Sequence, residues 1–95
     1  MSDPELFVLS SLADGDKHGY AMMIDIEEFS GHKLGPGTLY GAITRLEERG
    51  WIRPVASDDR RLPYRLTAEG RKCLTEQQAG MERIVKTGQR RLKNA

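Results

Sequence analysis

The most informative stretch of this sequence is GPGTLYGAITRLEERGW, residues 35–51. Apolar side chains recur in it at i, i+3, i+4 and i+7, the spacing of one face of an amphipathic helix, and predict a helix over residues 37–49. That apolar face consists of Leu39, Ala42, Ile43 and Leu46. The opposite face carries small and hydroxyl-bearing groups, which raises the question of what it contacts. It consists of Thr38, Tyr40, Gly41 and Thr44.

Two further helices are expected upstream. The first spans residues 4–13, with Asp3 as its cap and Pro4 at its first position. It is apolar around much of its girth, so we expect it to be buried on two sides. The second spans residues 18–29 and ends at Ser30-Gly31.

Downstream of Gly50, which suits a helix C-terminus, the periodicity changes. WIRPVAS (51–57) and LPYRLT (62–67) read as two short strands joined by the turn DDRR (58–61). Their prolines, Pro54 and Pro63, favour edge strands. Thr67 can then cap a last helix over about residues 68–92, which carries a weak, interrupted heptad pattern.

The order helix–helix–helix–strand–strand–long helix is that of a winged helix-turn-helix. We therefore predict a mainly α fold with a small β-hairpin and a C-terminal helix for dimerisation. The winged helix-turn-helix is expected over residues 1–67 and the dimerisation helix over residues 68–95. A lone helix of this composition is marginal in water and needs a surface to pack on.

The bulk composition narrows the class of protein. Ninety-five residues make one small domain, and the longest wholly apolar run, Leu6 to Leu9, is far too short to span a membrane. The acidic N-terminus does not resemble a secretion signal, and the single cysteine, Cys73, excludes an internal disulfide. We therefore expect a cytoplasmic protein.

The net charge of +1 conceals an asymmetry along the chain. Residues 1–32 carry a net charge of −6, residues 33–66 carry +3 and residues 67–95 carry +4. A chain divided in this way can present a basic face to nucleic acid. The charge alone leaves an ordinary scatter of surface charges as an equal alternative.

The sequence resembles the PadR family of winged-helix transcriptional regulators. The resemblance runs through LFVLSSL (6–12), HGYAMMIDIE (18–27), GPGTLYGAITRLEERGWI (35–52) and DDRRLPYRLTAEGRKCL (58–74). It implies a homodimeric DNA-binding repressor with its third helix in the major groove and its hairpin as a wing. In that family the C-terminal helical region carries dimerisation and often frames an effector pocket.

Chemistry and resemblance together suggest which side chains contact DNA. Hydroxyl groups near the start of a recognition helix suit base edges and phosphates, and the arginines of the wing suit phosphates or the minor groove. Glu47 and Glu48 would repel phosphate and limit the reading face to the N-terminal turns. The alternative for this face is simple solvation. The candidate DNA-binding residues are Tyr20, Lys33, Gly37, Thr38, Tyr40, Gly41, Thr44, Arg45, Arg60 and Arg61.

Dimerisation is expected through the last helix, with the first helix as its packing partner. The candidate interface residues are Leu6, Phe7, Leu74, Met81, Val85 and Leu92.

Enzyme motifs are lacking. His18 and His32 have no partners at metal-ligand spacing, and no GxSxG, Walker A or HExxH pattern occurs. No catalytic residue, metal or cofactor is expected. Cys73 reads as a small buried hydrophobe, with redox sensing as a minor alternative.

The sequence thus predicts a sequence-specific transcription regulator, a dimeric repressor bound to a palindromic operator and relieved by an effector. The alternative is a winged-helix module that binds another protein and no DNA.

Overall fold

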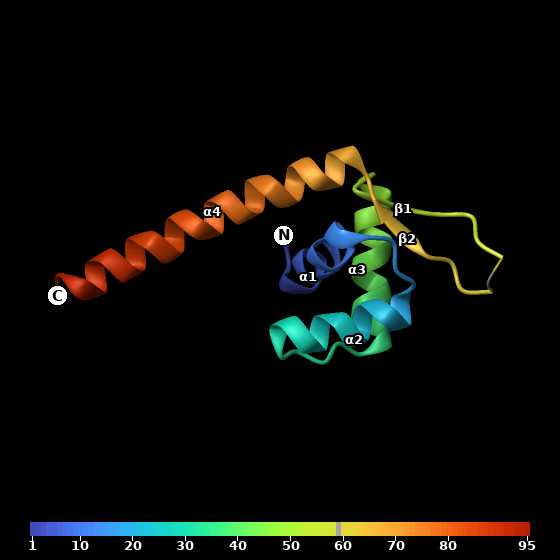
Figure 1. Ribbon diagram of the computed structural model, residues 1–95, viewed down its shortest axis with the longest axis horizontal. Coiled ribbons are helices and arrows are strands. Elements are labelled where there is room, and N and C mark those ends of the chain that lie inside the picture. Colours follow the sequence, from blue (N-terminus) through green and yellow to red (C-terminus); the bar gives the residue numbers. More distant parts are fainter. Residues whose placement is uncertain (59) are drawn as a thin grey trace.

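The computed structural model describes residues 1–58 and 60–95 and confirms the predicted fold class (Figure 1). Asp59, in the predicted DDRR turn, lies outside the described residues. The elements are α1 (Asp3–Ser11), the 3-10 turn η1 (Leu12–Asp14), α2 (Gly19–Ser30), α3 (Pro36–Glu48), β1 (Ile52–Pro54), β2 (Tyr64–Leu66) and α4 (Ala68–Lys93).

The helix ends follow from local hydrogen bonds. Asp3 was the wrong cap for α1, because Ser2 takes that place and its Oγ accepts from the Glu5 N–H at 3.4 Å. Thr67 caps α4 as predicted, since its Oγ1 accepts from the Gly70 N–H at 3.0 Å. Gly50, at φ 76°, adopts the left-handed conformation predicted where α3 ends.

The core lies where α1, α2 and α3 meet. All four predicted apolar residues of α3 are buried in it: Leu39, Ala42, Ile43 and Leu46. α1 contacts α2, α3 and α4, which is the two-sided burial predicted for a helix apolar around its girth. The face of α3 opposite to this core is therefore left for another partner.

The wing is a short antiparallel hairpin in which Ile52 pairs with Leu66 and Pro54 with Tyr64. Both strands are shorter than predicted. Beyond Pro54 the Val55 N–H still donates to the Pro63 carbonyl at 2.9 Å, but Pro63 has no N–H with which to complete the pair. A third segment, not foreseen, joins this sheet: the Lys17 N–H donates to the Tyr64 carbonyl at 3.2 Å, and the Tyr64 N–H donates to the Lys17 carbonyl at 2.9 Å. The wing is thereby tied to the segment that leads into α2.

α4 is fixed to the body at its beginning. The Thr67 hydroxyl donates to the Gly50 carbonyl at 2.7 Å, and a Cβ at Gly70 would lie 1.9 Å from the Trp51 carbonyl oxygen. Glycine is thus required for this close approach. Leu74 still packs in the core, whereas the C-terminal part of α4 projects beyond the other elements (Figure 1).

Candidate nucleic-acid interface

The outward side of α3 carries the residues predicted to read DNA. Thr38, Tyr40 and Thr44 are exposed, and Gly41 is half-buried among them. They lie opposite the core side of the same helix, so the amphipathic spacing separates them from the packing residues.

The N-terminal end of α3 presents backbone donors to solvent. Its cap, Gly35, has no side chain to accept from the first turn, and Pro36 at the first position has no N–H. The exposed Gly37 and Thr38 follow, where N–H groups lack an acceptor within the helix. The positive end of the helix dipole adds to these donors, and this geometry suits an anion such as a phosphate.

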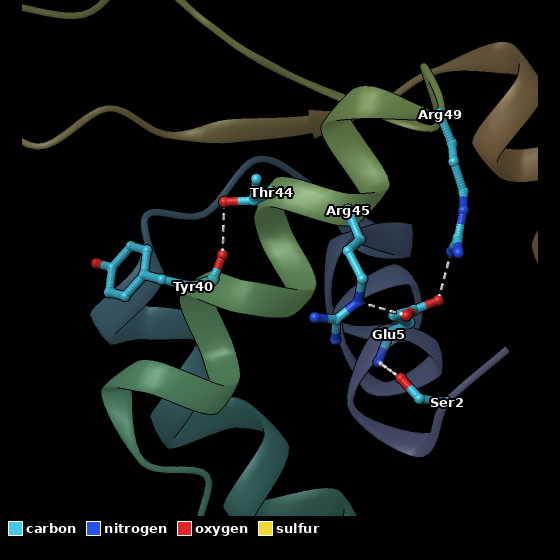
Figure 2. Close-up of polar contacts among 6 residues, drawn as sticks. All are labelled: Ser2, Glu5, Tyr40, Thr44, Arg45 and Arg49. Atoms are coloured by element: carbon cyan, nitrogen blue, oxygen red, sulfur yellow. Dashed lines mark hydrogen bonds and ion pairs between the residues drawn. The ribbon is translucent and has the colours of Figure 1, made fainter.

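Thr44 is held in one orientation by its own helix. Its Oγ1 donates to the Tyr40 carbonyl at 2.9 Å (Figure 2). The hydroxyl proton is therefore engaged, and what remains outward is the oxygen's accepting capacity and the methyl group. This side chain can accept from a base amino group or contact a thymine methyl.

A hollow of about 250 Å³ brings the wing to the side of α3 and the start of α2. It is lined by four of the predicted residues, Tyr20, Tyr40, Arg60 and Arg61, together with His18, Gly19, Leu62 and Tyr64. Tyr40 rests on Gly19, where a Cβ would lie 2.3 Å from the Tyr40 hydroxyl oxygen. Gly19 therefore allows Tyr40 to lie across the end of α2 and form one wall of the hollow.

The other flank of α3 carries a charge cluster that the sequence analysis missed. Arg45 and Arg49 both reach towards α1 (Figure 2). The Arg45 Nε donates to Glu5 Oε1 at 2.8 Å, and the Arg49 Nη1 donates to Glu5 Oε2 at 2.6 Å. Arg49 also lies over the Trp51 ring, with its guanidinium carbon 5.2 Å from the centroid.

Glu5 is 4% exposed, and its ionisation depends on these arginines. Burial raises its pKa, but hydrogen bonds from Arg45 and Arg49 outweigh burial and lower the pKa to about 2. A signal was present in the sequence, since Glu5 is the only charged residue in the apolar segment 4–13. A carboxylate on a helix buried on two sides requires a partner.

The remaining polar residues around the interface have structural contacts. The His18 Nδ1 accepts from the Ala21 N–H at 3.3 Å and so caps α2. Arg65 makes a bidentate contact with Asp16, in which Nε donates to Oδ1 at 3.0 Å and Nη2 donates to Oδ2 at 2.7 Å. These hydrogen bonds lower the pKa of Asp16. Lys33 is exposed in the segment between α2 and α3.

The predicted dimer residues divide into two groups. Leu74 is 4% exposed and belongs to the core of its own chain, while Leu6 and Phe7 are partly buried against that core. Met81, Val85 and Leu92 remain exposed on α4. Ile84, which the sequence analysis missed, is 74% exposed on the same side, and its i+3 spacing from Met81 was the available signal.

Within the described residues no group of three or more His, Cys, Asp or Glu could hold a metal ion. None of the described helices is long and apolar enough to cross a membrane. Burial raises the pKa of the Cys73 thiol, which keeps it protonated and favours the packing role predicted for it.

A three-helix body, a two-stranded wing and a projecting C-terminal helix make up a winged helix-turn-helix fold. The model of the Transcriptional regulator PadR-like family matches residues 8–76, and the chain belongs to this family. The resemblance seen in the sequence is thereby confirmed.

Two relatives illustrate the match in sequence. The chain is 32% identical over 84 residues to the Transcriptional regulator Rv3488 of Mycobacterium tuberculosis, covering 85% of this chain and 78% of that protein. It is 46% identical over 83 residues to an uncharacterized 37.1 kDa protein in transposon TN4556 of Streptomyces fradiae. That match covers 87% of this chain and only 24% of the relative's length.

Two solved structures are similar along nearly the whole chain. A PadR family transcription regulator from Clostridium difficile R20291 has a TM-score of 0.87 at 27% identity, with 96% of this chain and 99% of that chain covered. A transcriptional regulator from Clostridium thermocellum has a TM-score of 0.79 at 29% identity, with 92% and 93% covered. The projecting α4 is thus included in the similarity.

Proposed function

We propose that this transcription regulator acts as a sequence-specific DNA-binding repressor in the form of a homodimer. The observation that carries the proposal is the outward face of α3. Its N-terminal turns combine open backbone donors with Thr38, Gly41 and Thr44, and the hollow with Arg60 and Arg61 lies beside them. Base-reading side chains and phosphate-binding side chains therefore lie on one side of the molecule.

In this proposal the N-terminal half of α3 enters the major groove. Gly41 lacks a side chain and lets the helix approach closely, while Thr38 and Thr44 contact base edges. The wing arginines contact the flanking phosphates or the minor groove, and Lys33 adds a phosphate contact. Glu47 and Glu48, both exposed at the C-terminal end of α3, turn away from the backbone of the duplex.

Basic side chains flank α3 on two sides, which supports DNA over a protein partner. Arg60 and Arg61 lie with Tyr40 at the wing flank, and Arg45 lies at the α1 flank, on the opposite side of the helix from Tyr40 (Figure 2). A helix lodged in a groove has a phosphate backbone on each side, so cations on both flanks match its charge.

Dimerisation is assigned to the exposed apolar side of α4. Gly80, Met81, Ile84 and Gly88 lie along one side of this helix. Glycines let a second helix approach closely, and the exposed apolar side chains give that helix something to cover. The division into a DNA-binding part, 1–67, and a dimerisation helix, 68–95, is part of this proposal.

Dimerisation has a direct test. Met81→Asp places a charge in the apolar seam and should convert a sedimenting dimer into a monomer. Glu82→Ala changes a neighbouring residue in the exposed Lys86 pair and serves as the control. An intact Met81→Asp dimer would move the interface away from this side of α4.

Repression follows from occupancy. A two-fold dimer places its two recognition helices about 34–36 Å apart, so we expect a palindromic operator with half-sites one helical turn apart. A bound dimer would exclude polymerase from the promoter. A small-molecule effector would relieve repression by favouring a dimer in which the two helices no longer match that spacing.

Selection of bound duplexes from a random pool at near-physiological salt tests DNA recognition. We expect enrichment of a palindromic motif. Enrichment of no motif, with binding to a protein partner instead, would establish the interaction module and reject the proposal.

A paired variant tests the wing. Arg60→Ala with Arg61→Ala should weaken binding to all duplexes and flatten its salt dependence by about one unit of slope for each phosphate that is no longer neutralised. Arg71→Ala with Lys72→Ala removes the same charge at exposed positions of α4 and should leave the slope unchanged. An equal effect from both pairs would assign the salt dependence to net charge and remove the wing from the interface.

A further inference from the structure

The arrangement of Glu5, Arg45 and Arg49 leaves one cation facing outwards. A single carboxylate is shared by two guanidinium groups, one oxygen to each. Arg49 is engaged on a second side by the Trp51 ring. One positive charge therefore remains uncompensated in the cluster, and Arg45 is the member that lies nearer the N-terminal half of α3.

Arg45 offers its outer nitrogens towards the reading face. Glu5 contacts it through Nε only, and within the described residues neither Nη1 nor Nη2 donates to an acceptor. Nη1 lies 3.3 Å from the position of a Cβ on Gly41, so the guanidinium extends over the turn that contains Thr38 and Gly41. The Arg45 side chain is 47% exposed, while the Glu5 side chain is 5% exposed.

The anchor itself is rigid. Glu5 lies in the first turn of α1, where its backbone N–H is held by the Ser2 cap and the helix dipole favours a negative charge. Its two oxygens are both engaged, so it cannot rotate without losing an ion pair. A carboxylate bond to Nε fixes the plane of the guanidinium and leaves four N–H donors in a fork.

We propose that Glu5 is a positioning residue for DNA recognition, holding Arg45 so that its Nη1 and Nη2 groups donate to O6 and N7 of a guanine in each operator half-site. The inference rests on the proposed DNA-binding function. It adds the base that is read, a guanine, and the side chain that reads it, Arg45 held by Glu5. An arginine side chain that is already held by an ion pair loses less conformational entropy on binding DNA than a mobile arginine does.

Arg49 supplies the matched comparison. It bonds the same carboxylate, but it follows Arg45 by one turn at the C-terminal cap of α3 and stacks on Trp51. Glu48 lies between Arg45 and Arg49 in the sequence. Arg49 therefore stabilises the fold. Arg45 stabilises the fold and is also placed to contact a base.

The test begins with the wild-type operator from duplex selection and a copy in which one guanine pair per half-site is replaced. The wild type should prefer the guanine duplex by roughly 5- to 150-fold for each replaced pair, the discrimination of one bidentate arginine contact. Arg45→Ala should lose that preference, and Arg45→Lys should retain at most part of it, because an ammonium can contact guanine but has no planar fork. Arg45→Lys keeps its charge, so its binding to random duplex should stay within about twofold of wild type.

Glu5→Gln should lose most of the guanine preference while retaining binding to random duplex. In an Arg45→Ala background, Glu5→Gln should have no further effect, within about twofold, because Glu5 acts through Arg45. Arg49→Ala should lower the melting temperature but preserve the guanine preference. Circular dichroism confirms that each variant is folded, and if Glu5→Gln is not, Glu5→Asp takes its place, because it keeps the charge on a side chain too short for the same contact with Arg45.

Three results would overturn the inference while the proposed function stands. One is guanine preference retained in Arg45→Ala. Another is an equal further loss from Glu5→Gln when Arg45 is already alanine. The third is tighter binding of Glu5→Gln to every duplex, which would mean that Glu5 withholds Arg45 from DNA. A wild-type protein that enriches no motif would instead reject the proposed function and this inference with it.

Discussion

The two ends of α3 differ in how they are held. At the C-terminal end the helix is enclosed by α1, the wing and the start of α4, through Arg49, Trp51 and Gly70. At the N-terminal end it begins with Gly35, Pro36 and Gly37, all exposed. The helix is thus anchored at one end and open at the other, which is how a fixed scaffold presents a reading surface.

The largest expected effect on stability comes from adding a side chain at Gly70, beside the C-terminal end of α3. Gly70→Ala places a Cβ against the Trp51 carbonyl, where backbone must move, and should destabilise the domain by about 3 kcal/mol or more. Chemical denaturation followed by circular dichroism measures the change in free energy of unfolding.

The same substitution at the open end is the control. Gly37→Ala meets no atom within 4 Å among the described residues, and alanine gains helix propensity, so stability should rise by up to about 1 kcal/mol. Equal losses at the two positions would contradict the difference between the ends.

The next largest effect is the dependence of the unfolding free energy on pH, to which Glu5 contributes. The pKa of Glu5 is about 2 in the folded chain, below its ordinary value of 4.5. In the interval between these values the unfolded chain binds more protons, so stability rises with pH; the contribution of Glu5 is complete above pH 4.5 and is lost as the pH falls towards 2. It amounts to no more than about 3.5 kcal/mol.

Glu5→Gln should therefore flatten the dependence of the unfolding free energy on pH between about 4.5 and 2. Denaturation midpoints at several pH values measure it. A wild-type slope retained in the variant would mean that the cluster does not stabilise the folded chain.

A smaller effect is expected at the open end. Thr44→Val keeps the methyl group and removes the hydroxyl that bonds the Tyr40 carbonyl, so stability should change by about 0.5 kcal/mol or less at this exposed position. Discrimination between operator and random duplex should nevertheless fall, because the accepting oxygen is absent from valine. Competition binding at fixed salt measures it, and equal losses on both duplexes would remove Thr44 from the reading face.

A similarly small change in stability is expected at the exposed ion pair between Asp16 and the wing. Asp16→Asn breaks the contact with Arg65, whose side chain is about half exposed, and exposed pairs contribute about 0–1 kcal/mol. A shift in unfolding free energy as large as that of Glu5→Gln at neutral pH would contradict the distinction between buried and exposed charge.

Periodicity was sufficient for the elements and for the buried side of α3, because helix and strand spacings follow from local geometry. The contacts between distant segments escaped it. Glu5 lies 40 residues from Arg45, and Lys17 pairs with Tyr64 in the sheet. Only tertiary packing brings such residues together, although an isolated charge in an apolar helix indicated that Glu5 needed a partner.

The site was predictable as a set of residue types, and less so as an arrangement. Hydroxyls and glycines on the outward side of α3 follow from helical spacing. The sharing of Tyr40 and the wing arginines in one hollow does not, because it depends on the pairing of Tyr64 with Lys17 and on the packing of Tyr40 against Gly19. Local strand and helix propensities do not predict these contacts between distant segments.

Residue-resolved hydrogen exchange, with and without the selected operator, tests the central claim most directly. If the open end of α3 reads DNA, the amides of Gly37 and Thr38 should exchange rapidly in the free protein and become protected on the operator. Amides near Leu46, already bonded within the helix, should change little. Protection confined to the wing, or no change at Gly37 and Thr38, would contradict the account.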